Sequence, residues 1–260
     1  MHQRVSAPKK LPGVHVDLDH GFLHSVESGG AVDGPGMRFV FFMAGCQFRC
    51  VYCHNPDTWK LHNGRRVDVD AMLAEVRPYA GFLKFAGGVT FSGGEPMMQA
   101  GFVGNVMAHI KQEMGLHIAL DTQGYLHTGV EDDWFDNVDL VMLDIKHIDP
   151  EKYHAITAQY LQPTLDFAER LKRLRKKMWM RYVLVPDLTD DTDDVNRMAD
   201  FVATLGDIVE RVEVLPFHQM GVSKWDALKM EYTLRDTRTP TNEEAEAARD
   251  IFRARGLVAS

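Results

Sequence analysis

The chain alternates between short apolar runs and longer amphipathic stretches, and this alternation constrains its fold more than any other feature. Six runs are rich in β-branched and aromatic residues, and most are continuous rather than alternating in polarity. Continuous runs are typical of strands buried on both faces of a parallel sheet. We therefore expect strands at residues 39–44, 89–92, 117–121, 140–145, 179–185 and 212–217.

Helical patterns separate these runs. Thr192-Asp193-Asp194 and Thr241-Asn242-Glu243 offer N-cap residues for two of the helices. Strand followed by helix, repeated six times, predicts an α/β fold with a parallel sheet. Because eight such units close the usual ring, six predict an incomplete (β/α)6 barrel of parallel strands with outer helices. The clearest helical patterns cover residues 69–79, 99–114, 164–177, 193–205 and 242–255.

The composition of the chain and its lack of an internal linker predict one globular domain. With 260 residues, 45% hydrophobic and 25% charged, the chain suits an ordinary soluble protein, and no stretch approaches the roughly 18 apolar residues of a membrane span. The net charge of -8 argues against a nucleic-acid binder. No internal linker or repeat interrupts the chain, so we expect a single domain over residues 24–260. Residues 1–23 are expected to form a poorly ordered lead-in.

Polar and glycine residues follow five of the expected strands. In parallel α/β folds the chemistry lies at the carboxyl ends of the strands, so we expect these residues to meet at one rim. One polar ending would mean little, but five around one loop indicate a site. The endings are Gly45-Cys46, Ser92-Gly93-Gly94-Glu95-Pro96, Asp121-Thr122, Asp144-Ile145-Lys146 and Pro216-Phe217-His218.

The three cysteines of the chain lie within eight residues of one another. Cys46, Cys50 and Cys53 form a C-x3-C-x2-C pattern, which brings three soft thiolates onto one loop. Such a loop suits an iron–sulfur cluster or zinc better than disulfides. Both kinds of site normally take four protein ligands. The fourth ligand is therefore either another residue or a small molecule at an open iron.

Simpler explanations of the cysteine loop also exist. Three buried hydrophobic cysteines would rarely fall so close together by chance. His54 could complete a structural zinc site, although adjacent residues seldom both reach one tetrahedral ion. The run from Cys50 to His54 also matches C-x-x-C-H, the attachment signature of c-type haem. That haem is attached outside the cytoplasm, whereas the start of this sequence shows no signal segment, so we expect a cytoplasmic protein.

The motifs around these positions resemble the radical S-adenosylmethionine (SAM) superfamily and, within it, the family that activates glycyl-radical enzymes. The three-cysteine pattern is shared by the whole superfamily. The Asp-Gly-Pro-Gly run and the residues after Cys53 narrow the resemblance, which extends from about His24 to the last helix. The matching segments are 32–38, 46–59, 92–95, 120–124, 139–146, 181–186 and 215–218.

The resemblance implies a cofactor, a reaction and partners. Cys46, Cys50 and Cys53 would each bind one iron of a 4Fe-4S cluster, and SAM would chelate the fourth iron. One electron would then cleave SAM to methionine and a 5′-deoxyadenosyl radical. The radical would take a hydrogen from a glycine of pyruvate formate-lyase in anaerobic metabolism. Reduced flavodoxin or ferredoxin would supply the electron to an activase expected to be a monomer.

The resemblance also implies which residues bind SAM. Glycines let the backbone approach a ligand closely, so Gly93 and Gly94 would meet the methionine moiety. Arg181 interrupts an apolar strand, where an unpaired charge is costly. We expect it to face the site and to pair with SAM or with an Asp or Glu across the barrel. The other residues implied are Tyr52, His54, Glu95, Asp144, Ile145, Lys146 and His218 for SAM, and Asp121, Thr122 and Asp144 for a monovalent cation.

Three other functions remain open at this point. The chain could activate a different glycyl-radical enzyme, or it could be a radical SAM enzyme that acts on a small molecule. From a different class, it could be a non-catalytic zinc or c-type haem protein. Some relatives carry an inserted ferredoxin-like domain with extra cysteines, and this chain has no cysteine beyond the loop.

Overall fold

The computed structural model describes residues 9, 11 and 14–260, which form two compact units. The first unit contains residues up to 47 and residues 58–142, and the second contains residues 48–57 and 143–260. Of the predicted lead-in, residues 1–23, residues 1–8, 10, 12 and 13 lie outside the described residues. The first strand begins at His20, before the predicted start of the domain at residue 24.

The first unit is built on strands in the order β3-β1-β2-β4-β5-β6. β2 runs parallel to β4, and β4 runs parallel to β5, with Met43 opposite Gly93 at the carboxyl ends of the first pair. β1 is antiparallel to both of its neighbours. The strands are β1 (His20–Gly30), β2 (Met37–Met43), β3 (Arg65–Asp68), β4 (Gly87–Gly93), β5 (Ile118–Thr122) and β6 (Leu140–Asp144).

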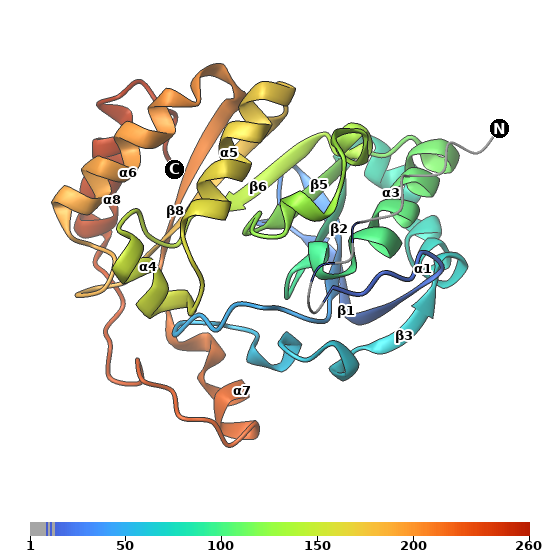
Figure 1. The fold of residues 1–260 in the computed structure, drawn as a ribbon, viewed down its shortest axis with the longest axis horizontal. Helices are drawn as coiled ribbons and strands as arrows, with labels where there is room; N and C mark the ends of the chain where they lie inside the picture. The colour runs from blue at the N-terminus through green and yellow to red at the C-terminus, as the bar shows by residue number, and fades with distance from the viewer. Residues whose placement is uncertain (1–8, 10, 12–13) are drawn as a thin grey trace. The chain divides into compact units, whose positions relative to one another are not determined.

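The helices of the first unit are α1 (Val69–Val76), α2 (Ala80–Ala86) and α3 (Ala100–Met114). α1 begins at an N-cap, Asp68, whose carboxylate accepts a hydrogen bond from the Ala71 amide. α3 ends at Gly115 in the left-handed conformation, where glycine carries no Cβ penalty. α1 and α3 pack against each other (Figure 1). Apolar side chains of both helices are buried in the core of this unit.

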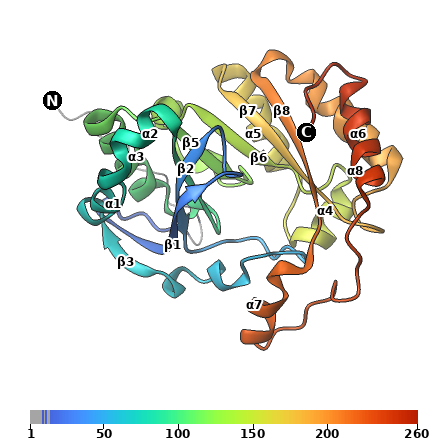
Figure 2. The same ribbon diagram turned by 180° about the vertical axis from the view of Figure 1, so that it is seen from behind.

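The second unit contains the end of β6 followed by β7 (Lys177–Leu184) and β8 (Val209–Pro216), which are parallel. α6 and α8 lie side by side, and α8 packs on β8 (Figure 2). Thr241 caps α8 in a capping box with Glu244, as its sequence predicts. The helices are α4 (Pro150–Thr157), α5 (Gln162–Leu174), α6 (Thr192–Thr204), α7 (Val222–Ala227) and α8 (Asn242–Arg253).

The structure confirms all six predicted strands, which are β2 and β4 to β8, and the five clearest helices. The cap of α6 is Asp191, one residue before the predicted group. The sequence patterns missed β1, whose second half is exposed, and the short elements β3, α2, α4 and α7. Among the described residues, no helix is long and apolar enough to cross a membrane.

Candidate functional site

In the first unit, two glycines at the end of β4 bring the backbone against the cysteine loop. A Cβ on Gly94 would lie 2.3 Å from the Gly45 oxygen and 3.2 Å from the Cys46 Cβ. Gly93 has φ +111° and would place a Cβ 2.4 Å from the Met43 nitrogen. The Glu95 amide also donates to the Gly45 oxygen over 2.8 Å. A side chain at Gly94 would therefore displace the turn that carries Cys46, and one at Gly93 would displace the end of β2.

Glu95 ties the end of β4 to the end of β5. Its buried carboxylate accepts hydrogen bonds from the Met97 amide at 2.9 Å, the Thr122 hydroxyl at 2.8 Å and the Gln123 amide at 3.0 Å. Burial raises the pKa of Glu95 to about 7, although these hydrogen bonds oppose the shift. Beside it, the Ser92 hydroxyl donates to Asp121 over 2.6 Å. The predicted residues Glu95, Asp121 and Thr122 are thus gathered in one hydrogen-bonded rim.

Gln99 is a buried residue of this rim that the sequence reasoning missed. Its amide nitrogen donates to the Phe22 and Ala44 oxygens, both at 2.8 Å, and its oxygen accepts from the Phe22 amide at 2.6 Å. It therefore joins β1 to the last residue before Gly45-Cys46. A lone glutamine at the start of a helical pattern gives no local signal for such a role.

Arg38 fixes the Asp-Gly-Pro-Gly turn that narrows the family resemblance. Its buried guanidinium donates from Nε to the Thr90 hydroxyl at 2.9 Å and from Nη1 to the Pro35 oxygen at 3.3 Å. Thr90 in turn donates to the Asp33 oxygen at 2.6 Å. Burial lowers the pKa of Arg38 to about 10, which leaves it charged at neutral pH. The turn is thereby fastened to the sheet by two buried side chains.

In the second unit, Cys50 and Tyr52 lie near the ion pair of Lys146 and Asp144. The pair spans 2.9 Å, and its side chains are only 11% and 15% exposed. It is therefore not the surface ion pair that its strand-end position would otherwise suggest. Burial raises the pKa of the Cys50 thiol to about 12, and the Lys146 charge opposes this shift. The buried Tyr52 hydroxyl makes no hydrogen bond with the described residues, so a polar ligand atom would satisfy it.

His54 and His218 stack on each other. Their ring centres are 4.2 Å apart at an interplanar angle of 30°. His54 Nε2 lies 3.1 Å from the His218 carbonyl oxygen, which can only accept, so Nε2 carries the proton. This hydrogen bond leaves Nδ1 as the acceptor nitrogen of the His54 ring. Burial, followed by the His218 charge, lowers the pKa of His54.

Arg181 has the acidic partner that the sequence predicts, on a neighbouring strand rather than across a barrel. Its Nε donates to Glu213 on β8 at 3.0 Å, and the two residues are opposite each other in the β7–β8 register. Both side chains are largely buried. Arg181 also accepts a backbone hydrogen bond from Ile145, the buried middle residue of the predicted SAM-binding segment.

The donor set of the cysteine loop fits an iron–sulfur cluster. None of the three cysteines forms a disulfide, and Cys46 and Cys50 are buried. Thiolates are the ligands that such clusters require. Within residues 9, 11 and 14–260, no three His, Cys, Asp or Glu side chains are gathered closely enough to hold a single metal ion. The cation ligands proposed from the sequence, Asp121, Thr122 and Asp144, stay a prediction, because a threonine belongs to none of these residue types.

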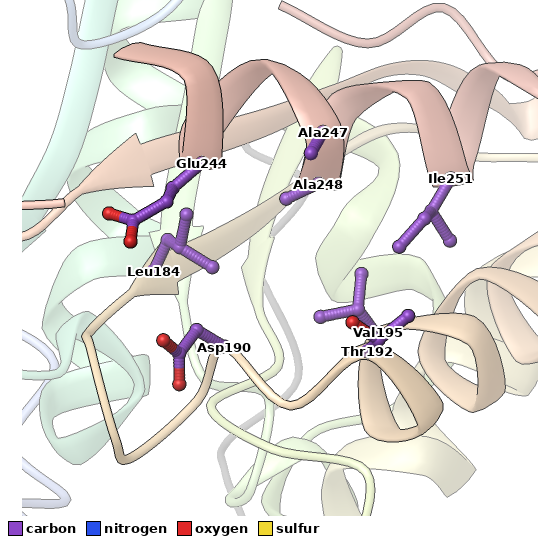
Figure 3. Close-up of a pocket in the computed structure, with 8 residues that line it drawn as sticks. All are labelled: Leu184, Asp190, Thr192, Val195, Glu244, Ala247, Ala248 and Ile251. Atoms are coloured by element: carbon purple, nitrogen blue, oxygen red, sulfur yellow. The ribbon is translucent and has the colours of Figure 1, made fainter. Parts of the chain in front are cut away.

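A small cavity of about 150 Å³ lies in the second unit, apart from the predicted residues. Ala247, Ala248 and Ile251 of α8 face Val195 and Thr192 of α6 across it (Figure 3). The carboxylate of Glu244 at its edge is already paired with Arg238. None of the residues predicted to bind a cofactor lines this cavity.

Sequence comparison identifies the family to which this chain is similar. The family model described as the radical SAM superfamily matches residues 40–202. The chain is 42% identical over 246 residues to the pyruvate formate-lyase-activating enzymes of Staphylococcus aureus strains USA300 and NCTC 8325, covering 92% of this chain and 97% of each relative.

Solved structures show the same fold. A domain of a pyruvate-formate lyase-activating enzyme from Bacteroides vulgatus aligns with a TM-score of 0.55 and 23% identity, covering 67% of this chain and 98% of that domain. SuiB from Streptococcus suis, bound to its precursor peptide SuiA, aligns with a TM-score of 0.65 and 13% identity over 91% of this chain and 50% of its own. At these identities the likeness concerns the fold alone, and it supports the predicted partial barrel.

Proposed function

This chain belongs to the radical SAM superfamily and, within it, to the pyruvate formate-lyase-activating enzymes, and from this premise we propose that it installs a glycyl radical on pyruvate formate-lyase. The observation that carries the proposal is the 42% identity over nearly the full length of both proteins. The C-x3-C-x2-C loop and its close contact with Gly94 agree with it.

Membership of this family implies an oxidoreductase that uses a 4Fe-4S cluster and SAM. When bound, the cluster would pass one electron from an external donor to SAM, and SAM would supply the radical chemistry that removes a hydrogen atom from the partner's glycine. The chain's own part is to bind, orient and exclude water. Cys46, Cys50 and Cys53 would hold the cluster, and the Lys146 ammonium would favour the thiolate form of Cys50.

The predicted SAM-binding residues divide by the part of SAM they would contact. The backbone at Gly93 and Gly94 offers close approach to the methionine moiety, and Glu95 holds that backbone through Met97. The buried hydroxyl of Tyr52 and the stacked rings of His54 and His218 offer a polar group and an aromatic surface for the adenosyl moiety. The remaining members of the predicted set are Asp144, Ile145, Lys146 and Arg181.

Several finer points belong to the same proposal. We expect reduced flavodoxin or ferredoxin as the electron donor, a monomeric cytoplasmic enzyme, and a single domain over residues 24–260. A monovalent cation near the SAM carboxylate would be bound by Asp121, Thr122 and Asp144. Neither nucleic acid nor a membrane is an expected partner.

An isotope-transfer experiment tests the proposed reaction. Pyruvate formate-lyase with deuterium on its glycine Cα is incubated anaerobically with the reduced, reconstituted protein and SAM. Deuterium appearing in 5′-deoxyadenosine supports the proposal, because the hydrogen must then come from the partner's glycine. Cleavage of SAM without transfer would contradict this partner and favour another glycyl-radical enzyme or a small-molecule substrate. A colourless zinc protein, or a sharp haem band, would contradict the whole assignment.

A further inference from the structure

A segment distant in the sequence contacts the chain just after the third cysteine. The indole Nε1 of Trp225, in α7, donates to the Cys53 carbonyl oxygen over 2.8 Å, across a sequence separation of 172 residues. Trp225 is only 5% exposed. A buried hydrogen bond to the backbone of a cluster ligand limits where that ligand's side chain can point.

The neighbouring residue, Lys224, holds the next part of the same loop. Its ammonium donates to the Asn55 side-chain oxygen at 2.8 Å and to both Asp57 carboxylate oxygens at 3.1 and 3.2 Å. Three oxygens from two residues therefore converge on one cation. Such charge-assisted bonds are stronger than neutral ones and fix the loop between Asn55 and Asp57.

A glycine permits the close approach of the two segments. A Cβ on Gly221 would lie 2.8 Å from the His54 Cα and 3.2 Å from its carbonyl oxygen. Both of these are backbone atoms, which cannot swing aside as a flexible side chain can. Gly221 thus allows residues 218–225 to lie directly on residues 53–57.

Residues 219 and 225 of the contacting segment are held in turn by residues that follow them in the sequence. Gln219 donates from Nε2 to the oxygens of Leu234 and Thr237, both at 2.8 Å. The rings of Trp225 and Tyr232 are 5.1 Å apart. Residues 218–237, which we call the bracing segment, therefore make contacts among themselves as well as with the cysteine loop.

Each cysteine has a different backbone anchor. The Cys46 amide donates to the Trp59 oxygen at 3.1 Å. Cys50 lies between Arg49 and Val51, whose amides donate to the oxygens of the last two residues of α4 at 2.9 and 3.0 Å. For Cys53, the bracing segment supplies the hydrogen bond from Trp225.

We propose that the bracing segment is a positioning element that holds residues 53–57 in their cluster-binding conformation before any cofactor binds. Lys224 and Trp225 act as positioning residues through the loop and touch neither cluster nor SAM. The inference rests on the proposed function for its biological meaning. The positions of residues 53–57, by contrast, depend only on contacts within the chain.

Hydrogen–deuterium exchange on the metal-free protein tests this directly. Trp225→Phe removes the indole donor, Lys224→Met removes the cation, and Gly221→Ala introduces the clash. Trp179→Phe is the matched control, because the indole of Trp179 in β7 is also buried but lies against Arg211 in β8. The quantity compared is the exchange rate of a peptide covering residues 48–59, divided by that of a β4 peptide, which none of these substitutions contacts.

We expect this ratio to rise about tenfold in Trp225→Phe and to rise also in Lys224→Met and Gly221→Ala, while Trp179→Phe matches the wild type. A ratio unchanged in all three variants would overturn the proposal, as would an equal rise in the control. Three independent substitutions keep the test decisive if one of them fails to fold.

A second measurement uses the reconstituted holoenzyme. The rate at which a chelator removes iron should rise in the same order as the exchange ratio, with the control unchanged. Equal rates in all variants would contradict a positioning role toward the cluster. If the wild-type protein binds no cluster, the proposed function fails, but the exchange measurement still decides whether the bracing segment orders the loop.

Discussion

The two units hold their predicted site residues by different means. In the first unit, the wholly buried side chains of Glu95 and Gln99 are hydrogen bonded mainly to backbone atoms within the sheet core. In the second, the loop after Cys53 is held by side chains from far along the chain, including Lys224, which is 38% exposed. Buried hydrogen bonds to the backbone keep a segment in one conformation, whereas partly exposed contacts open more easily in local fluctuations.

Because the two units hold their site residues differently, mutations in them should have different effects. Changes in the first unit should lower the stability of the fold, because they leave buried polar groups without partners. Changes in the second unit should act more on cofactor binding, because its loop contacts lie nearer to solvent. The exception is the ion pair of Asp144 and Lys146, which is buried almost as fully as the first unit's network.

The largest effect is expected for Cys50→Ser, which removes a predicted cluster ligand while nearly keeping its size. The purified variant should retain no 4Fe-4S cluster and form no glycyl radical, because a hydroxyl is a poor substitute for a thiolate ligand. Iron and sulfide analysis measures the first and electron paramagnetic resonance the second. A variant that keeps a full cluster would show that Cys50 is not a ligand.

Asp144→Asn should lower the unfolding free energy by about 3–5 kcal/mol, because it leaves the buried Lys146 ammonium uncompensated. Urea denaturation of the metal-free protein measures this. Asp207→Asn is the control, since its pair with Arg175 is exposed and should contribute nothing measurable. Equal stability of the two variants would mean that the Asp144–Lys146 pair is solvated in solution.

Glu95→Gln should change how stability depends on pH. Burial raises the pKa of Glu95 from 4.5 to about 7, so between these values the folded state keeps a proton that the unfolded state has released. This contribution to stability is fully present below pH 4.5 and is lost as pH rises through 7. The stability of the wild type relative to Glu95→Gln should therefore fall by on the order of 3 kcal/mol across that window.

Unfolding curves at several pH values measure this difference. The exposed Glu131→Gln serves as the control and should leave the pH profile unchanged. If the unfolding free energies of wild type and Glu95→Gln change equally with pH, the pKa of Glu95 is not raised. Water would then reach the buried network of the first unit.

The smallest effect is expected for His218→Ala, which removes one ring of the stacked pair with His54. Loss of one aromatic contact should raise the dissociation constant for SAM about three- to tenfold and leave the fold intact. Equilibrium dialysis with the reconstituted enzyme measures it. His154→Ala, which loses a similar stack with Tyr160, is the control. Equal affinity in both variants would remove His218 from the SAM site.

Much of the fold could be predicted because its signals are local. The continuous apolar runs of β2 and β4 to β8 predict buried parallel strands, and Thr241 predicts the start of α8. β1 could not be recognised, because five consecutive residues of its second half are exposed and the strand is held by its pairing with β2 and β3. α7 is only six residues long and has no amphipathic period to detect.

The candidate site divides in the same way. The cysteine spacing and the Gly93-Gly94 pair are local and were recognised from the sequence. Gln99 and Trp225 were not, because their roles arise from hydrogen bonds across 55 and 172 residues. The acidic partner of Arg181 was expected from the cost of a buried charge, but only the strand register identifies it as Glu213.

The central claim is that this chain activates pyruvate formate-lyase, and electron paramagnetic resonance of the partner tests it most directly. The reduced, reconstituted protein is incubated anaerobically with SAM and pyruvate formate-lyase, and with Cys50→Ser in parallel. We predict a glycyl-radical doublet that depends on SAM and is absent with the variant. A protein that cleaves SAM yet leaves pyruvate formate-lyase without this doublet would contradict the claim.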